Sequence, residues 1–224
     1  MSGVGGVQEY FTRAAVTFDS LYSPEKTSRF KRFLNQTFRP DIYERFLLTV
    51  SHVKRYQPNS VLDVGCGSGR YAIALTQAGV TRYQGIDLSP AMIQLAKDAA
   101  ATLTVEGKPE FIRGDFMDLH TDEKFDIILA MGLFDYIKEP AVVLSKMKAL
   151  ANHSVVASFS SRSWYRTPIR KARYVVKRCP VYFYDRKTIE RLSMQAGFAR
   201  TAIHKIEGAG QDYFVQLFRD YKPA

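Results

Sequence analysis

The sequence predicts an α/β fold: a doubly wound, mostly parallel sheet of seven strands with an antiparallel edge strand. From Ser60 onward, short apolar segments alternate with longer segments of helical spacing, which is typical of a parallel sheet wrapped by helices. Two final apolar segments are joined by a turn that contains glycine, which favours an antiparallel pair. The chain has 224 residues, 46% of them apolar, enough to bury a core without disulfides.

The strands are short segments bounded by turn residues. We expect strands at residues 61–64, 82–87, 110–113, 125–131, 154–159, 198–206 and 213–218. The fourth of these reads FDIILAM and has a single charge, as a central strand covered on both faces should. The last two flank Gly208 and Gly210 and form the predicted antiparallel pair.

The helices are predicted from apolar spacing and from end signals. A helix over 69–78 ends at Gly79, and a second begins where Ser89 caps Pro90. Two more are expected over 140–150 and 186–196, the latter stopped by a glycine.

We predict one domain over residues 1–224. It divides into a helical cap (1–57), a core (58–160), a basic lid or crossover (161–185), and a C-terminal helix with its strand pair (186–224). Within the basic segment, arginines and lysines alternate with aromatic residues and no acid occurs between residues 161 and 178.

The formal charge of +10 is unevenly distributed. Residues 1–60 carry a net +4, residues 61–160 a net −3, and residues 161–224 a net +9. A protein that coats a polyanion would be basic throughout, so this pattern indicates a near-neutral core with a basic attachment.

The sequence also sets expectations for compartment and ligands. Only Cys66 and Cys179 are present, the chain starts without a signal-peptide pattern, and its apolar runs are too short to cross a bilayer. We therefore expect a soluble, cytoplasmic protein without a metal site. Peripheral contact with an anionic membrane remains open because of the basic segment.

The most informative motif is VLDVGCGSG, where a strand runs into a glycine-rich turn that opens a helix. Its glycines allow the backbone to turn sharply and to approach a ligand closely. The spacing is G-x-G-x-G, and Asp63 lies two residues before the first glycine. A carboxylate there would repel a pyrophosphate and attract an ammonium or sulfonium, which argues against a dinucleotide.

Two further acids follow the next two strands. Asp87 lies 18 residues beyond Gly69, a position that suits a carboxylate holding a ribose diol, and Asp115 is followed by Phe116. Three acids thus lie at the carboxyl ends of successive strands, where open α/β sheets bind ligands.

These segments, together with YQGIDLSPAMIQLAK, FIRGDF and FDIILAMGLFDYI, resemble the motifs of class I S-adenosylmethionine-dependent methyltransferases, which have a Rossmann-like fold. The resemblance is strong over about residues 58–160. The overall layout, which includes a late aromatic cluster at Tyr182-Phe183-Tyr184, loosely resembles that of the magnesium-protoporphyrin methyltransferases within this superfamily.

The resemblance implies a site for S-adenosyl-L-methionine, with S-adenosyl-L-homocysteine as the product. The methionine part would lie among Asp63, Gly65, Gly67 and Gly69; the adenosine near Asp87, Leu88, Met92, Asp115 and Phe116; and the sulfonium beside Met131 and Gly132. At the N-terminus, Tyr10 and Tyr22 resemble residues of cap helices that close over the cofactor and the acceptor.

Methyl transfer from a sulfonium is an in-line displacement, so the protein must chiefly align the nucleophile. The loop after the fourth strand faces the methyl group in the family, which makes Asp135 and Tyr136 candidates for the base and for substrate positioning. The alternative is that Asp135 caps a helix and that Tyr136 packs over the cofactor. His153 and His204 are further candidate bases, with structural roles as the alternative.

The acceptor is expected to be a small molecule, and an anionic group on it would suit a basic lid. The loop MGLF lacks the Asn/Asp-Pro-Pro-aromatic pattern of base-modifying enzymes, which makes nucleic acid a weaker candidate. Two alternatives stay open, an RNA-associated methyltransferase that uses the basic C-terminal third, and a cofactor-binding protein without catalysis. The sequence does not predict the oligomeric state.

Overall fold

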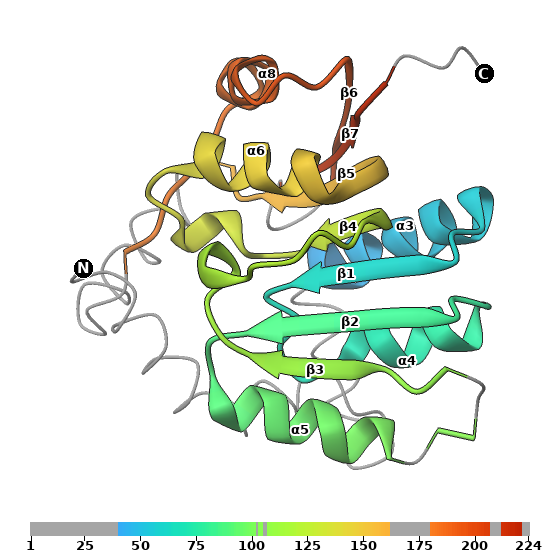
Figure 1. Ribbon diagram of the computed structural model, residues 1–224. Helices are drawn as coiled ribbons and strands as arrows, with labels where there is room; N and C mark the ends of the chain where they lie inside the picture. Colours follow the sequence, from blue (N-terminus) through green and yellow to red (C-terminus); the bar gives the residue numbers. More distant parts are fainter. Residues whose placement is uncertain (1–39, 102, 105–106, 162–179, 207–211, 221–224) are drawn as a thin grey trace.

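The computed structural model describes residues 40–101, 103–104, 107–161, 180–206 and 212–220. Its seven strands form one sheet in the order β3-β2-β1-β4-β5-β7-β6 (Figure 1). The strands are β1 (Ser60–Val64), β2 (Arg82–Asp87), β3 (Glu110–Arg113), β4 (Phe125–Ala130), β5 (Ala151–Phe159), β6 (Arg200–Lys205) and β7 (Tyr213–Phe218). The predicted seven-stranded α/β fold is therefore confirmed.

The first five strands pair in parallel, so their carboxyl ends meet at one edge of the sheet. Strand β7 lies between β5 and β6 and runs antiparallel to both. The edge strand β6 is thus antiparallel to its neighbour, as predicted. The position of β7 inside the sheet is a finding of the structure.

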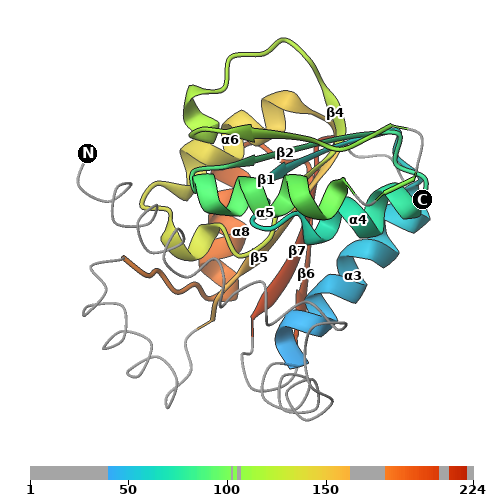
Figure 2. The same cartoon turned by 90° about the horizontal axis from the view of Figure 1, so that it is seen from below.

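Helices flank both faces of the sheet (Figures 1 and 2). They are α3 (Pro40–Tyr56), α4 (Arg70–Gln77), α5 (Pro90–Ala100), α6 (Pro140–Leu150) and α8 (Arg186–Gln195), with short 3-10 turns η1 (Phe116–Asp118) and η2 (Phe134–Tyr136). One apolar cluster joins α3 and α4 to their face, and a second joins α6 and α8 to the opposite face. α5 packs against β2 and β3, beside α4.

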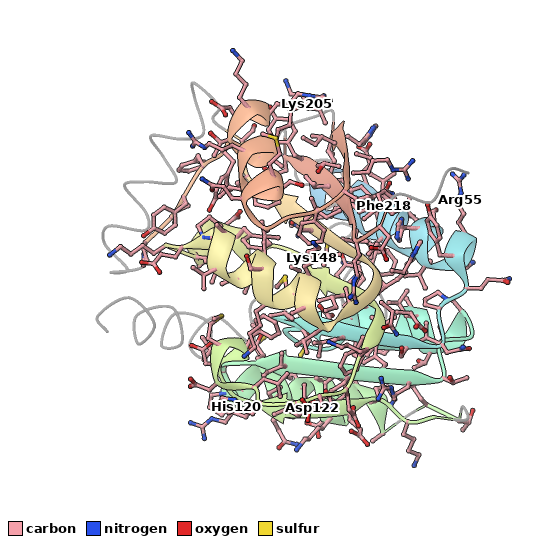
Figure 3. All side chains as sticks on the ribbon, turned by 45° about the horizontal axis from the view of Figure 1, so that its top comes forward. Arg55, His120, Asp122, Lys148, Lys205 and Phe218 are labelled. Atoms are coloured by element: carbon pink, nitrogen blue, oxygen red, sulfur yellow. The ribbon has the colours of Figure 1, made fainter. Side chains whose placement is uncertain are left out.

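Local chemistry explains several boundaries. The Ser89 hydroxyl accepts a hydrogen bond from the Met92 amide at 3.3 Å, and Pro90 occupies the first turn of α5. Asp185 caps α8 in the same way, through the Thr188 amide at 2.8 Å. The carbonyl of Gly197, beyond the end of α8, accepts a hydrogen bond from Lys148 of α6, which is labelled in Figure 3.

Some element ends differ from the sequence expectations. β5 begins at Ala151 and not at residue 154, because the backbone turns extended directly after α6 and Ala151 pairs with Phe125. His153 therefore lies inside β5. β6 is confined to residues 200–205, and β4 ends one residue before Met131. Within the described ranges, none of the helices has the length and apolar character that crossing a membrane requires.

Candidate functional site

The turn after β1 has the backbone geometry that its glycines predict. Gly65, Gly67 and Gly69 have φ angles of +75°, +54° and +76°, in the left-handed region that favours glycine. The amides of Gly65 and Cys66 both donate to the Ile86 carbonyl of β2, at 2.8 and 3.2 Å. The turn is thereby fixed against the neighbouring strand.

Two of these glycines have different surroundings. A Cβ atom at Gly69 would lie 3.0 Å from the Ala96 Cβ and 3.2 Å from the Phe111 ring, so this glycine permits close packing of α4 and α5. A Cβ atom at Gly67 would meet nothing within 4 Å. The turn therefore has one closely packed glycine and one that faces open space, where a ligand can approach the backbone.

Asp63, the last but one residue of β1, is almost completely buried, with 1% of its surface exposed. Its Oδ2 accepts a 2.5 Å hydrogen bond from the hydroxyl of Tyr83, which is equally buried. Its Oδ1 is buried and has no hydrogen-bond partner among the described residues. Burial raises the pKa of Asp63 to about 7, the Tyr83 hydrogen bond opposes this rise, and the charge of Asp87 adds to it.

Asp87 ends β2 and connects the glycine turn to the start of α5. Its Oδ2 accepts from the Gly67 amide at 3.0 Å, and its Oδ1 accepts from the Ser89 amide at 2.8 Å. Burial raises the pKa of Asp87, while the two amides act in the opposite direction. The structure thus brings Asp63, Asp87 and the glycine turn together at the carboxyl edge of the sheet.

The other residues that are predicted to lie near the adenosine are close by, and they differ in how deeply they are buried. Leu88 is half-buried, and Met92 is buried in α5. Asp115 follows β3 and accepts from the Met117 amide at 2.8 Å, which caps η1. Phe116 is buried in the core, with the Lys146 ammonium 5.1 Å from its ring centroid. Their contacts with a cofactor stay predictions.

The loop after β4 is held from two sides. The Gly132 amide donates to the Ser158 hydroxyl oxygen at 2.8 Å, and Arg45 of α3 donates to the same oxygen at 3.1 Å. A Cβ atom at Gly132 would lie 3.7 Å from Arg45 Nη1. Met131 is half-buried and contacts the Thr49 hydroxyl through its sulfur at 3.6 Å. A guanidinium therefore lies beside the loop that, by the resemblance, would face the methyl group.

Asp135 is buried in η2, and its carboxylate is engaged with the end of β5. Ser160 donates to it twice, from its amide at 3.2 Å and from its hydroxyl at 2.7 Å. The Asp135 carbonyl accepts from the Tyr182 amide at 2.8 Å. Tyr136, its half-buried neighbour, also lies in η2. Asp135 thus links the loop after β4 to the two segments that follow β5.

The histidines proposed as bases have packing or surface contacts. His153 packs its ring against Tyr56, with centroids 4.6 Å apart, and against Phe218, which Figure 3 labels. His204 is exposed on β6 and forms a 3.6 Å ion pair with Glu44. Cys66 is a buried free thiol beside Asp63, and burial raises its pKa.

Part of the predicted site lies outside the described residues. Tyr10 and Tyr22, the segment 162–178 and Cys179 are all in that part of the chain. Among the described residues no group of three or more histidine, cysteine, aspartate or glutamate side chains is arranged to hold a metal ion.

Sequence reasoning missed Tyr83, Arg45, Ser158 and Ser160, because each meets a partner that is 20 or more positions away in the sequence. The one available signal was for Tyr83. It lies two residues before Gly85, which pairs with Asp63, so the two side chains share a face of the sheet.

Comparisons with known proteins agree with this geometry. The family described as Methyltransferase domain matches residues 61–153. The ubiquinone biosynthesis O-methyltransferases of Actinobacillus pleuropneumoniae and Pasteurella multocida are 33% and 30% identical over 129 and 142 residues, which cover 54% and 56% of this chain. The matches cover 54% and 57% of those proteins, so the chain spans just over half the length of each.

Among solved structures, the magnesium protoporphyrin IX methyltransferase of Synechocystis PCC 6803 with bound SAH superposes with a TM-score of 0.74 at 22% identity. The superposition covers 96% of this chain and 98% of that one, and shows that the two share a fold. The domain match over residues 61–153, together with the glycine-turn motif and the strand order, supports the resemblance to class I S-adenosylmethionine-dependent methyltransferases, and the solved structure shows the same fold.

Proposed function

We propose that this protein transfers the methyl group of S-adenosyl-L-methionine to an oxygen atom of a small-molecule acceptor. The observation that carries the proposal is the buried Asp63 carboxylate, one oxygen of which has no hydrogen-bond partner in the described part of the chain. It lies next to the glycine turn, where Gly67 faces open space. A buried carboxylate oxygen without a donor is costly, and a cationic ligand would satisfy it.

The residues present suit the cofactor. Asp63 Oδ1 would accept from its ammonium group, and the open space at Gly67 would admit it close to the backbone. Asp87 already accepts two amides, yet each carboxylate oxygen has a second lone pair for a ribose hydroxyl. Leu88, Met92, Asp115 and Phe116 complete the proposed adenosine side.

When bound, the cofactor supplies an activated methyl group on its sulfonium. The chain's own task is to orient the acceptor and to exclude water, and orientation alone is worth about 7–11 kcal/mol in well-aligned reactions. Met131 and Gly132 would border the reacting centre, and the Ser158 contact fixes the backbone there. Asp135 and Tyr136 are proposed to position the acceptor, and Asp135 also to accept its proton.

Transfer to oxygen is supported by the relatives. Those matching at 33% and 30% identity are both named O-methyltransferases. A hydroxyl acceptor would need a base, whereas a carboxylate would need none.

Arg45 supports an anionic acceptor. Its guanidinium lies beside Gly132 and Ser158, from the helix that covers this end of the sheet. Arginine binds carboxylates and phosphates in a bidentate way that lysine does not reproduce. We expect Arg45→Lys to raise KM for an anionic acceptor more than for its neutral analogue, in steady-state assays. An equal change in KM for the anionic acceptor and for its neutral analogue would contradict the proposal that Arg45 binds an anionic group.

The cofactor claim is tested by calorimetry with S-adenosyl-L-homocysteine. We expect binding by the unaltered chain and at least a tenfold loss with Asp87→Ala. Asp98→Ala is a matched control, since Asp98 is an exposed acid of α5 that contacts only Gln94 in the described bonds. Absence of binding by the unaltered chain would overturn the proposal.

Transfer itself is tested by incubating the protein with metabolite extract and methyl-labelled cofactor. A labelled product that loses its label under alkaline or demethylating conditions specific for esters and ethers supports oxygen. Binding of the cofactor with no labelled product in any extract would favour the catalytically inactive alternative.

RNA is the second candidate, favoured by the net +9 charge of residues 161–224. Filter binding across a salt series separates the two. An RNA-associated enzyme would lose affinity steeply as salt rises, since it releases counterions from many phosphates. We expect weak binding and no label in RNA.

A further inference from the structure

Tyr83 is a buried polar residue that the proposed mechanism does not yet use. It lies on β2 with 1% of its surface exposed, and its hydroxyl donates to Asp63 Oδ2 at 2.5 Å. Asp63 pairs with Gly85 in the parallel register of β1 and β2, so Tyr83 occupies the diagonal position on the same face. A long side chain at a diagonal position can reach across to its neighbour.

Gly85, which pairs with Asp63, leaves room for Cys66 and Phe111 beside this contact. A Cβ atom at Gly85 would lie 2.8 Å from the Cys66 sulfur and 2.9 Å from the Phe111 ring. Phe111 in turn packs against Tyr83, with ring centroids 6.2 Å apart. The buried phenol thus contacts Phe111 of β3 with its ring and Asp63 of β1 with its hydroxyl.

The two carboxylate oxygens of Asp63 consequently differ in their hydrogen bonding. Oδ2 is held by the only proton that the Tyr83 hydroxyl can donate, and Oδ1 is buried with no partner among the described residues. A carboxylate held at one oxygen cannot rotate freely, so the other oxygen has a fixed direction.

Resting on the function proposed above, we propose that Tyr83 is a positioning residue of the cofactor site, which holds Asp63 so that Oδ1 accepts from the cofactor's ammonium group. Tyr83 has no contact with the cofactor in this scheme. It acts through Asp63.

The electrostatics of the cluster make the proposal measurable. Burial raises the pKa of Asp63 to about 7, and the Tyr83 hydrogen bond counters that rise. In the described part of the chain, the other titratable groups that act on the pair are Asp87, Cys66 and Tyr71. An ammonium binds the ionised carboxylate, so affinity should increase as the pH rises through about 7. Without the Tyr83 hydroxyl the midpoint should move to higher pH.

The experiment is calorimetric titration of the full chain with S-adenosyl-L-homocysteine between pH 5.5 and 8.5. For Tyr83→Phe we expect a higher midpoint, and affinity at pH 6 should fall about tenfold if the midpoint rises from pH 7 to pH 8. Titration of the ligand's amine is common to both proteins and cancels in the comparison. Tyr56→Phe, which alters a tyrosine of α3 packed against His52 and His153, should keep the original midpoint.

A folded Tyr83→Phe protein with unchanged affinity and midpoint would overturn the role of Tyr83 while the proposed function stands. No binding by the unaltered chain would overturn both. If Tyr83→Phe does not fold, a fluorinated tyrosine at residue 83 retains the hydroxyl and makes it a stronger donor. The midpoint should then move to lower pH, and an unmoved midpoint would refute the proposal.

Discussion

At the scale of single residues, Asp135 shows how one side chain can serve structure and proposed chemistry together. Its carboxylate accepts two hydrogen bonds from Ser160, and its carbonyl accepts one from the Tyr182 amide. The loop after β4 is therefore fixed to the end of β5 through buried, charge-assisted bonds.

We expect Asp135→Asn to lower the free energy of unfolding by about 1–3 kcal/mol, because the amide cannot accept both Ser160 bonds. Turnover should fall with little change in cofactor affinity. Urea unfolding, initial rates and calorimetry measure the three effects.

Asp122→Asn is the control, since Asp122 is an exposed acid, labelled in Figure 3. If Asp135→Asn changed turnover without any loss of stability, Asp135 would act in chemistry alone. If turnover were unaltered, Asp135 would no longer count as a site residue.

At the scale of elements, the glycine turn between β1 and α4 separates two requirements. Gly69 permits close packing of α4 against α5, whereas Gly67 leaves space beside the backbone. Both have a positive φ angle, so an added side chain strains the backbone at each by about 1–2 kcal/mol. Only their surroundings differ.

We expect Gly69→Ala to destabilise the fold by roughly 2–4 kcal/mol, from backbone strain together with the contact at Ala96. Gly67→Ala should cost only about 1–2 kcal/mol, yet weaken binding of S-adenosyl-L-homocysteine more than tenfold. Thermal or urea unfolding and calorimetry on the same pair of variants test this. Equal losses of stability, with binding retained by Gly67→Ala, would contradict the division of roles.

The positions of helices and strands could be predicted where the sequence signal is local. The end signals at Ser89 and Gly197 and the apolar run of β4 place their elements within a residue or two. The insertion of β7 between β5 and β6 was not predictable, because strand order depends on contacts between distant segments. The same distinction holds for the site. Asp63 and Asp87 could be predicted because they belong to local motifs, whereas the contact of Arg45 with Ser158 could not, because the two residues are 113 positions apart.

At the scale of the whole molecule, His52 makes stability depend on pH. It lies on α3 and contacts Ser154 of β5 at 3.3 Å and Gln216 of β7 at 3.0 Å. Burial, with His153 and Arg55 nearby, lowers the pKa of His52 from 6.5 to about 4. The unfolded chain therefore binds this proton more readily, and the stability present above pH 6.5 is lost as the pH falls toward 4.

The difference between the pKa values of His52 in the unfolded and the folded chain corresponds to about 3 kcal/mol of folding stability. We expect His52→Gln to lose less stability than the unaltered chain between pH 7 and pH 4.5, measured by urea unfolding at each pH. The raised pKa of Asp63 works in the opposite direction, but it is common to both proteins. His120→Gln, at an exposed histidine labelled in Figure 3, should follow the unaltered chain. Parallel curves for all three would refute the role of His52.

The place of β7 has a consequence for biosynthesis. A ribosome makes β6 before β7, yet among the described strands β6 pairs with β7 alone, so β6 must wait for the strand that follows it. Until β7 arrives, β5 presents an apolar strand with an open edge, the feature through which nascent chains aggregate. A chain stalled or cut before residue 213 would hold every residue of the proposed cofactor site and still be exposed to self-association along β5.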